Sequence, residues 1–170
     1  MQPLRGFVCE DARLLKHDGA PARIQIHLRH AARSKAICPC CSKPAAGYDT
    51  QPERCWEFVP LWGIRVQLLY CPRRVECSRT PEFGVKVEAM PWSEGKHSAA
   101  RALMVFLSQW ARRMSWKEVA GVFGVSWEMV YRSVAWVVAF GLARRNLDGI
   151  SALGVDELHW GAEGKRATTT

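Results

Sequence analysis

Residues 115–134 carry the clearest pattern of hydrophobic and polar positions in the chain, and its spacing is that of a helix pair. Apolar residues recur at i, i+3, i+4 and i+7 in the first half of this stretch: Trp116, Val119, Ala120 and Phe123. This spacing places them on one face of a helix. Ser115 and Glu118 form a Ser-x-x-Glu capping box, so the helix should begin there. Gly124 should end it, because glycine readily adopts the positive φ of a tight turn between helices.

A second helix is predicted directly after that turn. Ser126 can cap its N-terminus, and Val125 can fill the corner between the two helices. Its buried stripe should consist of Val130, Val134 and Val137. The side chains expected on its outer surface near the start are Glu128, Arg132 and Ser133, beside the amphipathic Trp127 and Tyr131.

Two helices joined by a tight turn are the arrangement of a DNA-binding helix-turn-helix. The second helix of that motif enters the major groove, and its first residues lie at the base edges. We therefore predict double-stranded DNA as a partner. The predicted DNA contacts are Trp127, Glu128, Tyr131 and Arg132. An ordinary helical hairpin inside a protein core is the alternative interpretation.

The rest of the chain divides into a β-rich part and a helical part. Residues 23–29 alternate with a period of two, with Ile24, Ile26 and Leu28 on one side, which is typical of a strand. Further strands are predicted over residues 63–70 and 84–89. Helices should occupy residues 97 to about 145. Ser98 should cap the first of them, and the residues expected on its inner face are Leu103, Phe106, Leu107 and Trp110.

These patterns predict an α+β fold with domains over residues 1–95 and 96–148. The first should be a small β-rich domain, and the second a three-helix domain that contains the helix-turn-helix. A third segment, residues 149–170, begins with a new apolar run that leads into Asp156. The last helix of the second domain is apolar almost all round beyond Val130, so a partner surface is expected there.

The charge of the chain is consistent with a polyanionic partner. It has 24 Lys and Arg against 16 Asp and Glu, a formal net charge of +8. Neutralised phosphates release their condensed counterions, so a basic protein gains affinity for DNA. Arg112, Arg113 and Lys117 lie just before and inside the predicted helix-turn-helix, where they can contact the DNA backbone.

No apolar run of about 18 residues occurs, and the N-terminus has no apolar segment behind a basic one. We therefore expect a soluble, cytoplasmic protein without a membrane partner. In that compartment, seven cysteines favour metal binding or buried thiols over structural disulfides.

The strongest metal-binding pattern is the pair Cys38 and Cys41, whose Cys-x2-Cys spacing lets two thiolates bind one tetrahedral zinc ion. Cys77 is the predicted third ligand. The fourth is open: Cys71 is one candidate, and Cys40 or Cys55 could take its place. Small β-rich segments often need such a metal, because their own core is small. The alternative is a set of reduced thiols without metal.

The order of motifs resembles the N-terminal half of bacterial insertion-sequence transposases of the ISL-three family. The resemblance covers about residues 36–166. The pieces that carry it are Cys38 to Cys41, Tyr48-Asp49, Pro52-Glu53-Arg54, Glu57 to Gly63, Arg73 to Cys77, Gly84 to Trp92, Trp110 to Val134 and Gly154 to Trp160. One piece departs from the family pattern: Cys77 is not followed by a closely spaced second cysteine or histidine.

The resemblance implies a zinc-ribbon-like N-terminal domain and a helix-turn-helix that recognises the terminal repeats of the element. It also implies that residues 149–170 begin an RNase H-like DDE domain, with Asp156 as the first catalytic acid on its first strand. Such a domain binds two magnesium ions between three acids. Glu157 cannot be the second acid, because neighbouring side chains on a strand point to opposite faces. The later acids of the family pattern are missing, so we expect this truncated chain to be inactive alone.

The resemblance therefore implies a truncated transposase that is associated with the bacterial nucleoid and binds the ends of an insertion element. Such a chain could repress a full-length transposase, bind to it, or pair with itself. The alternative is a stand-alone helix-turn-helix transcriptional regulator, which would pair two half-sites of a palindromic target. An active nuclease assembled from several chains is a third, weaker interpretation.

Overall fold

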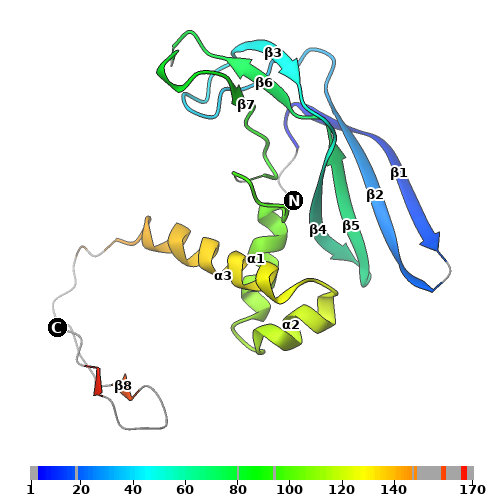
Figure 1. The fold of residues 1–170 in the computed structure, drawn as a ribbon, viewed down its shortest axis with the longest axis vertical. Coiled ribbons are helices and arrows are strands. Elements are labelled where there is room, and N and C mark those ends of the chain that lie inside the picture. Colours follow the sequence, from blue (N-terminus) through cyan, green and yellow to red (C-terminus); the bar gives the residue numbers. More distant parts are fainter. Residues whose placement is uncertain are drawn as a thin grey trace.

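The computed structural model describes residues 4–17, 19–79, 81–93, 95–146 and 148, together with the backbone of 158–159 and 166–167. The fold is mixed α+β, with a mostly β N-terminal part followed by helices, as the sequence predicts. Figure 1 shows the two larger sheets and the helices in one view. Among the described residues, no helix has both the length and the apolarity needed to cross a bilayer.

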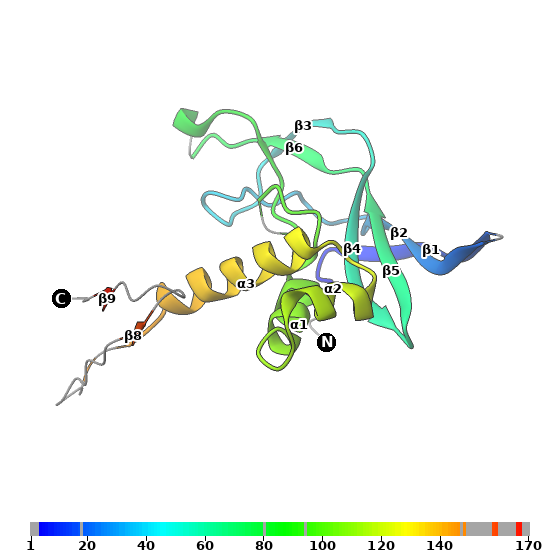
Figure 2. The same cartoon turned by 60° about the horizontal axis from the view of Figure 1, so that its bottom comes forward.

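The larger sheet has the order β1-β2-β5-β4. Its strands are β1 (Phe7–His17), β2 (Ala20–His30), β5 (Ile64–Tyr70) and β4 (Arg54–Leu61). β1 pairs antiparallel with β2, β2 pairs parallel with β5, and β5 pairs antiparallel with β4. The hairpin of β1 and β2 extends away from the rest of the molecule in both ribbon views (Figures 1 and 2).

The smaller sheet has the order β3-β6-β7. Its strands are β3 (Ala46–Thr50), β6 (Arg73–Glu76) and β7 (Lys86–Val87), and a short 3-10 turn at Pro81–Phe83 precedes β7. The strand predicted over residues 84–89 is therefore present as β7, but it is only two residues long. Past the helices, β8 (Leu158–His159) pairs antiparallel with β9 (Arg166–Ala167).

The core of the larger sheet lies on the face that carries the even-numbered residues of β2, β4 and β5. Leu28, Trp56, Leu68 and Tyr70 pack there against Trp92 and Ala100. Trp56 is fully buried and donates its indole N–H to the Ser93 hydroxyl at 3.1 Å. The odd-numbered face is polar instead: Gln67 donates to the Glu57 carboxylate at 2.8 Å and accepts from the Gln25 amide at 3.1 Å.

The helical part consists of α1 (Arg101–Trp110), α2 (Trp116–Phe123) and α3 (Trp127–Leu142). Their shared core contains Leu103, Met104, Leu107, Val119 and Val130, all essentially sealed from water. Trp110, expected to point inward, is 40% exposed at the C-terminal end of α1 and packs against Phe106 and Phe123. α3 extends beyond the other helices and away from the two larger sheets (Figures 1 and 2).

A short backbone pairing joins the helices to the larger sheet. The Glu57 N–H donates to the Ser98 carbonyl, and the Ala100 N–H donates to the Glu57 carbonyl, each at 2.8 Å. The prediction that Ser98 caps the first helix is therefore wrong. The helix begins at Arg101, and its N-cap, Ala100, makes no side-chain cap bond. Ser98 is not available as a cap, because residues 98–100 are held in extended backbone by β4.

Candidate metal centre and nucleic-acid interface

Three cysteine thiols converge at one end of the smaller sheet. The Sγ atoms of Cys38, Cys41 and Cys77 all lie within 4.8 Å of one another. The Sγ atoms of Cys41 and Cys77 are separated by 3.6 Å. In the described part of the chain, this is the one group of three or more such side chains that could hold a metal ion.

The local backbone explains why the thiols meet. Cys38 and Cys41 lie on a tight turn, closed by the Cys38 N–H bond to the Lys43 carbonyl at 2.9 Å and the Ser42 N–H bond to the Cys38 carbonyl at 3.0 Å. Ser42 takes a positive φ of 56° at the end of this turn. Cys77 follows β6 directly, and Val75 of that strand packs against Cys38 in a small buried cluster.

The spacing of the thiols suits a metal ion. Zinc–sulfur bonds of about 2.3 Å in a tetrahedron place sulfur atoms about 3.8 Å apart. The Cys41–Cys77 separation of 3.6 Å is close to that value. The three cysteines therefore offer three ligands of a tetrahedral site, and a metal ion there would join the turn to the end of β6.

The fourth ligand is not part of the cluster. Cys71, the candidate from the sequence, is exposed and lies outside the group of three. Cys55 and Cys9 are also exposed. Cys40 is exposed as well, and partial desolvation and the neighbouring Cys38 thiol raise its pKa, which disfavours the thiolate form that binds metal. The structure thus brings together three of the four predicted metal ligands and leaves Cys71 apart.

The second candidate site lies where α2 turns into α3. The capping box forms as predicted: the Ser115 N–H donates to the Glu118 carboxylate at 2.8 Å, and the Glu118 N–H donates to the Ser115 hydroxyl at 3.3 Å. The Ser115 hydroxyl also donates to the Glu118 carboxylate at 2.7 Å, and this bond together with the one from the Ser115 N–H lowers the pKa of Glu118. Gly124 ends α2 with a φ of +61°, and Ser126 caps α3 by accepting from the Met129 N–H at 3.1 Å.

Aromatic side chains occupy the start of α3. Trp127 is 52% exposed and Tyr131 is 47% exposed. Their rings are stacked, with centroids 5.7 Å apart and an interplanar angle of 5°. Trp116 of α2 packs against both rings, with centroids 5.8 and 5.6 Å away. The two exposed rings are therefore held in place by a third one from the neighbouring helix.

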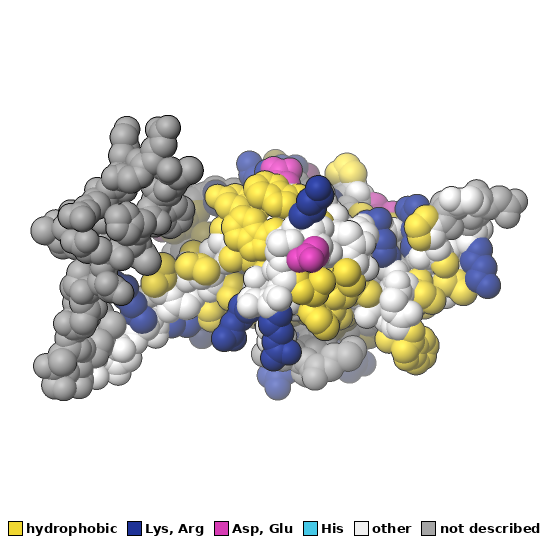
Figure 3. All heavy atoms as spheres, turned by 90° about the horizontal axis from the view of Figure 1, so that it is seen from below, with side chains coloured by type: hydrophobic (Ala, Val, Ile, Leu, Met, Phe, Trp, Pro, Cys, Tyr) yellow, Lys and Arg dark blue, Asp and Glu magenta, His cyan; other side chains and the backbone are white. Residues whose placement is uncertain are grey.

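Charged side chains flank these rings. Glu128 and Arg132 lie one turn apart on α3 and form an exposed ion pair at 2.7 Å. Arg112 and Arg113 are exposed in the connection between α1 and α2, and Lys117 is exposed on the first turn of α2. Figure 3 views this helical end, where hydrophobic side chains gather with Lys and Arg around them. The structure thus brings all the predicted DNA-contact residues to the surface.

The prediction that Ser133 lies on the outer surface of the second helix is wrong. Ser133 is buried, and its hydroxyl donates to the Met129 carbonyl at 2.6 Å. It lies three residues after Val130, on the same face of the helix, so it points toward α1 instead of solvent. A hydroxyl can occupy this position because it bonds to the carbonyl of the preceding turn.

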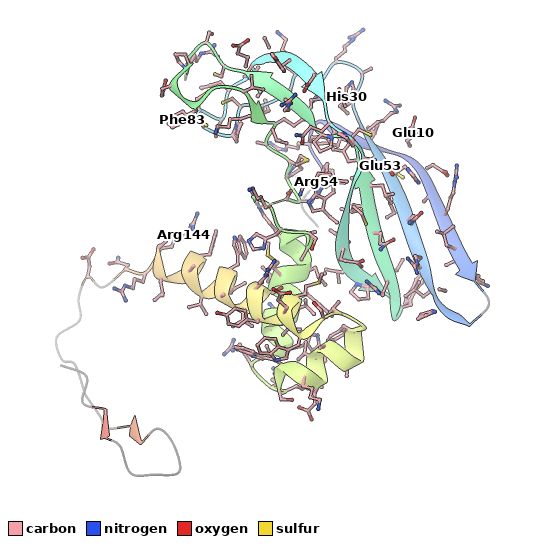
Figure 4. All side chains as sticks on the ribbon, viewed as in Figure 1. Glu10, His30, Glu53, Arg54, Phe83 and Arg144 are labelled. Atoms are coloured by element: carbon pink, nitrogen blue, oxygen red, sulfur yellow. The ribbon has the colours of Figure 1, made fainter. Side chains whose placement is uncertain are left out.

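The C-terminal half of α3 is apolar and uncovered within the described part of the chain. Val138, Phe140 and Leu142 are each about half exposed, at 52%, 47% and 55%. Arg144, labelled at the end of the helix in Figure 4, lies over the Phe140 ring at 3.6 Å. Asp156, the acid that the family resemblance implies for catalysis, lies outside the described residues.

No pattern in the sequence predicts the buried ion pair that lies beside the Cys38–Cys41 turn. The Glu88 carboxylate accepts from the Arg73 guanidinium at 2.7 Å and from the Tyr70 hydroxyl at 2.6 Å. Burial and the hydrogen bond to Glu88 raise the pKa of Tyr70. These residues come from β5, β6 and the segment after β7, and only the folded chain brings them together.

Comparisons with protein-family models, with curated proteins and with solved structures find no match for this chain.

Proposed function

We propose that this chain binds double-stranded DNA in a sequence-specific way, through a helix-turn-helix formed by α2 and α3. The observation that carries the proposal is the surface at the start of α3. A capped helix, a left-handed glycine and a second capped helix present Trp127, Glu128, Tyr131 and Arg132 to solvent side by side. This is where a recognition helix carries its base contacts.

The chemistry of these side chains fits the major groove. Arginine reads guanine through paired hydrogen bonds to O6 and N7, and apolar groups contact the thymine methyl. Arg132 can supply the first kind of contact, and the Trp127 and Tyr131 rings the second. Arg112, Arg113 and Lys117 supply positive charge next to them, for the phosphates that flank the groove.

The proposed target is the terminal repeat of an insertion element, as the resemblance to insertion-sequence transposases implies. Catalysis is not part of the proposal, because Asp156 lies outside the described residues. The metal bound by Cys38, Cys41 and Cys77 is proposed to be structural zinc. It would hold together a small sheet whose own core contains Ala36 and Val75 and few other buried apolar side chains.

A stand-alone transcriptional regulator is the second candidate, and the exposed apolar half of α3 favours it. Val138, Phe140 and Leu142 offer a surface for a second protein. A regulator of this kind would bind as a dimer to two half-sites related by a two-fold axis. A single asymmetric site bound by one chain would favour the transposase-like function instead.

Selection from a random duplex library tests the proposal. The purified chain is incubated with the library at about 0.15 M salt, a physiological ionic strength, and the bound duplexes are recovered and sequenced. The proposal predicts that one motif is enriched over successive rounds. A variant with both Trp127→Ala and Arg132→Ala should enrich no motif, whereas Arg13→Gln, on the β1–β2 hairpin, should enrich the same motif as the wild type. A wild-type pool that keeps the input composition would refute sequence-specific binding.

A further inference from the structure

The turn between β4 and β5 carries a residue that the backbone there disfavours. Leu61 pairs with Ile64, so Trp62 and Gly63 form a two-residue turn. Both have a positive φ, 49° for Trp62 and 78° for Gly63, which is the pattern of a type I′ turn. Asparagine, aspartate or glycine usually occupies the first position, because a bulky side chain is strained there. The local fold therefore gives no reason for a tryptophan.

The Trp62 side chain also gains little from packing. It is 89% exposed, and the neighbouring Leu61 is 45% exposed. Within the described part of the chain, the indole of Trp62 makes neither a ring contact nor a hydrogen bond. A strained backbone position that carries an exposed aromatic side chain points to a role in binding, because neither feature stabilises the folded chain.

This turn lies next to the helices that are proposed to bind DNA. A Cβ atom added at Gly124, the residue that ends α2, would lie 3.8 Å from the Arg65 Cδ atom. Both ribbon views show the start of β5 beside the end of α2 (Figures 1 and 2). At a rise of about 3.3 Å per residue, Trp62 lies within about 10 Å of Arg65 along the hairpin. The tip of the hairpin is therefore a neighbour of the α2–α3 turn.

The charges around the tip suit a polyanion. Residues 58–66 contain no acidic side chain. Arg65 forms an ion pair with Glu57 at 2.8 Å, so these two charges offset each other. Arg23 lies opposite Arg65 in the parallel pairing of β2 with β5 and adds positive charge at the same level of the sheet. A phosphate can approach this hairpin without meeting an unpaired carboxylate on residues 57–66.

We propose that the tip of the β4–β5 hairpin is a second DNA contact, with Trp62 and Leu61 against the minor groove that flanks the major groove occupied by α3. Apolar side chains bind minor grooves by packing on the sugars and wedging between base steps. The two grooves of B-DNA are about 12 and 6 Å wide, so a tip about 10 Å from the α2–α3 turn reaches the adjacent one. This proposal rests on the proposed function of α2 and α3.

Trp62→Asn separates a binding role from a structural one. Asn-Gly is a preferred sequence for a type I′ turn, so this variant should be at least as stable as the wild type in urea. It should nevertheless bind the selected duplex at least about fivefold more weakly, as expected when a tryptophan at the centre of a contact is lost. Phe83→Asn is the matched control. It removes an aromatic side chain that is 51% exposed, on the smaller sheet and distant from α2 (Figure 4), and should bind like the wild type.

Hydroxyl-radical footprinting of the full chain on the same duplex locates the contact. The wild type and Phe83→Asn should protect sugars on one flank of the selected motif, and Trp62→Asn should lose that protection and keep the protection within the motif. A Trp62→Asn chain that binds as tightly as the wild type, or binds more weakly with an unchanged footprint, would refute the proposal and leave the proposed function intact. A wild type that binds no duplex would refute the proposed function, and this proposal with it.

Discussion

The Arg132 guanidinium donates to the Glu128 carboxylate at 2.7 Å, one turn earlier on α3. Both side chains are about 60% exposed, at 60% and 63%. Exposed pairs of this kind contribute at most about 1 kcal/mol. The pair therefore orients Arg132 along the helix without preventing it from turning to a base. The negative charge of Glu128 also reduces the attraction of Arg132 to phosphates, which is independent of the DNA sequence.

Arg132→Ala should weaken binding to the selected duplex by about 5- to 150-fold, the equivalent of about 1–3 kcal/mol for a base-reading arginine. It should also relax the preference at one position of the motif. Arg145→Ala, on an exposed arginine beyond the other end of α3, is the matched control and should change affinity by less than about threefold. Fluorescence anisotropy with labelled duplex measures both. Equal affinities for wild type and Arg132→Ala would place the recognition surface elsewhere.

Gly124→Val should destabilise the α2–α3 pair. The residue has a φ of +61°, and a β-branched side chain there costs about 1–3 kcal/mol. Gly121→Ala is the matched control, since Gly121 lies inside α2 and an added Cβ would meet no atom within 4 Å. That change should stabilise the helix by up to about 1 kcal/mol. Urea unfolding followed by tryptophan fluorescence compares the two, and equal stabilities would contradict the assigned turn.

Substitution of a predicted zinc ligand should abolish metal binding by the chain. Protein purified under reducing conditions should contain about one zinc per chain, and Cys38→Ser should contain nearly none, because a three-thiolate cluster would lose its most buried member. Cys71→Ser, on an exposed thiol outside the cluster, should keep the full amount. Elemental analysis gives the ratio. Zinc absent from the wild type, or lost equally in both variants, would argue against the site.

Glu88→Gln should be among the most destabilising single changes in the β part. The Glu88 side chain is 1% exposed and the Arg73 side chain 17% exposed, so the change leaves a largely buried guanidinium without its counter-charge. Breaking a buried pair in this way costs about 3–5 kcal/mol. Asp49→Asn removes the partner of Arg74 in an exposed pair and should have a much smaller effect. Thermal unfolding of the two variants measures the difference.

The alkaline limit of stability should depend on Tyr70. Burial and Glu88 raise the pKa of its hydroxyl above the ordinary value of 10.0. The folded state therefore keeps this proton at a pH where the unfolded chain has lost it, so stability is full below pH 10 and falls above it. The loss should approach about 1.4 kcal/mol per pH unit for one group. Tyr70→Phe should be less stable than the wild type at pH 8, but its free energy of unfolding should fall less steeply above pH 10. Identical dependence of the unfolding free energy on pH in the two proteins would exclude this contribution.

The helix boundaries around the proposed recognition surface could be predicted because their signals are local. Ser115, Gly124 and Ser126 each determine the backbone within three or four residues of themselves, and each takes its predicted place in the structure. The Cys38–Cys41 turn is local in the same sense. The convergence of Cys77 on it needed the smaller sheet to form, yet its thiol does lie within reach.

Features that depend on distant segments could not be predicted in this way. The parallel pairing of β2 with β5 joins residues about 40 positions apart, and the sequence of neither strand indicates which strand it pairs with. Ser98 resembles a helix cap in sequence, but Glu57 of β4 holds it in extended backbone. Ser133 is polar, yet its position in the helical repeat buries it.

The most direct test of the central claim is to map the DNA-contact surface by amide chemical shifts. Spectra of the chain are compared with and without the duplex recovered by selection. The account predicts the largest shifts over residues 126–133 at the start of α3 and around Arg112, Arg113 and Lys117, with little change along β1. Large shifts confined to the β1–β2 hairpin or to the smaller sheet, with the start of α3 unchanged, would contradict it.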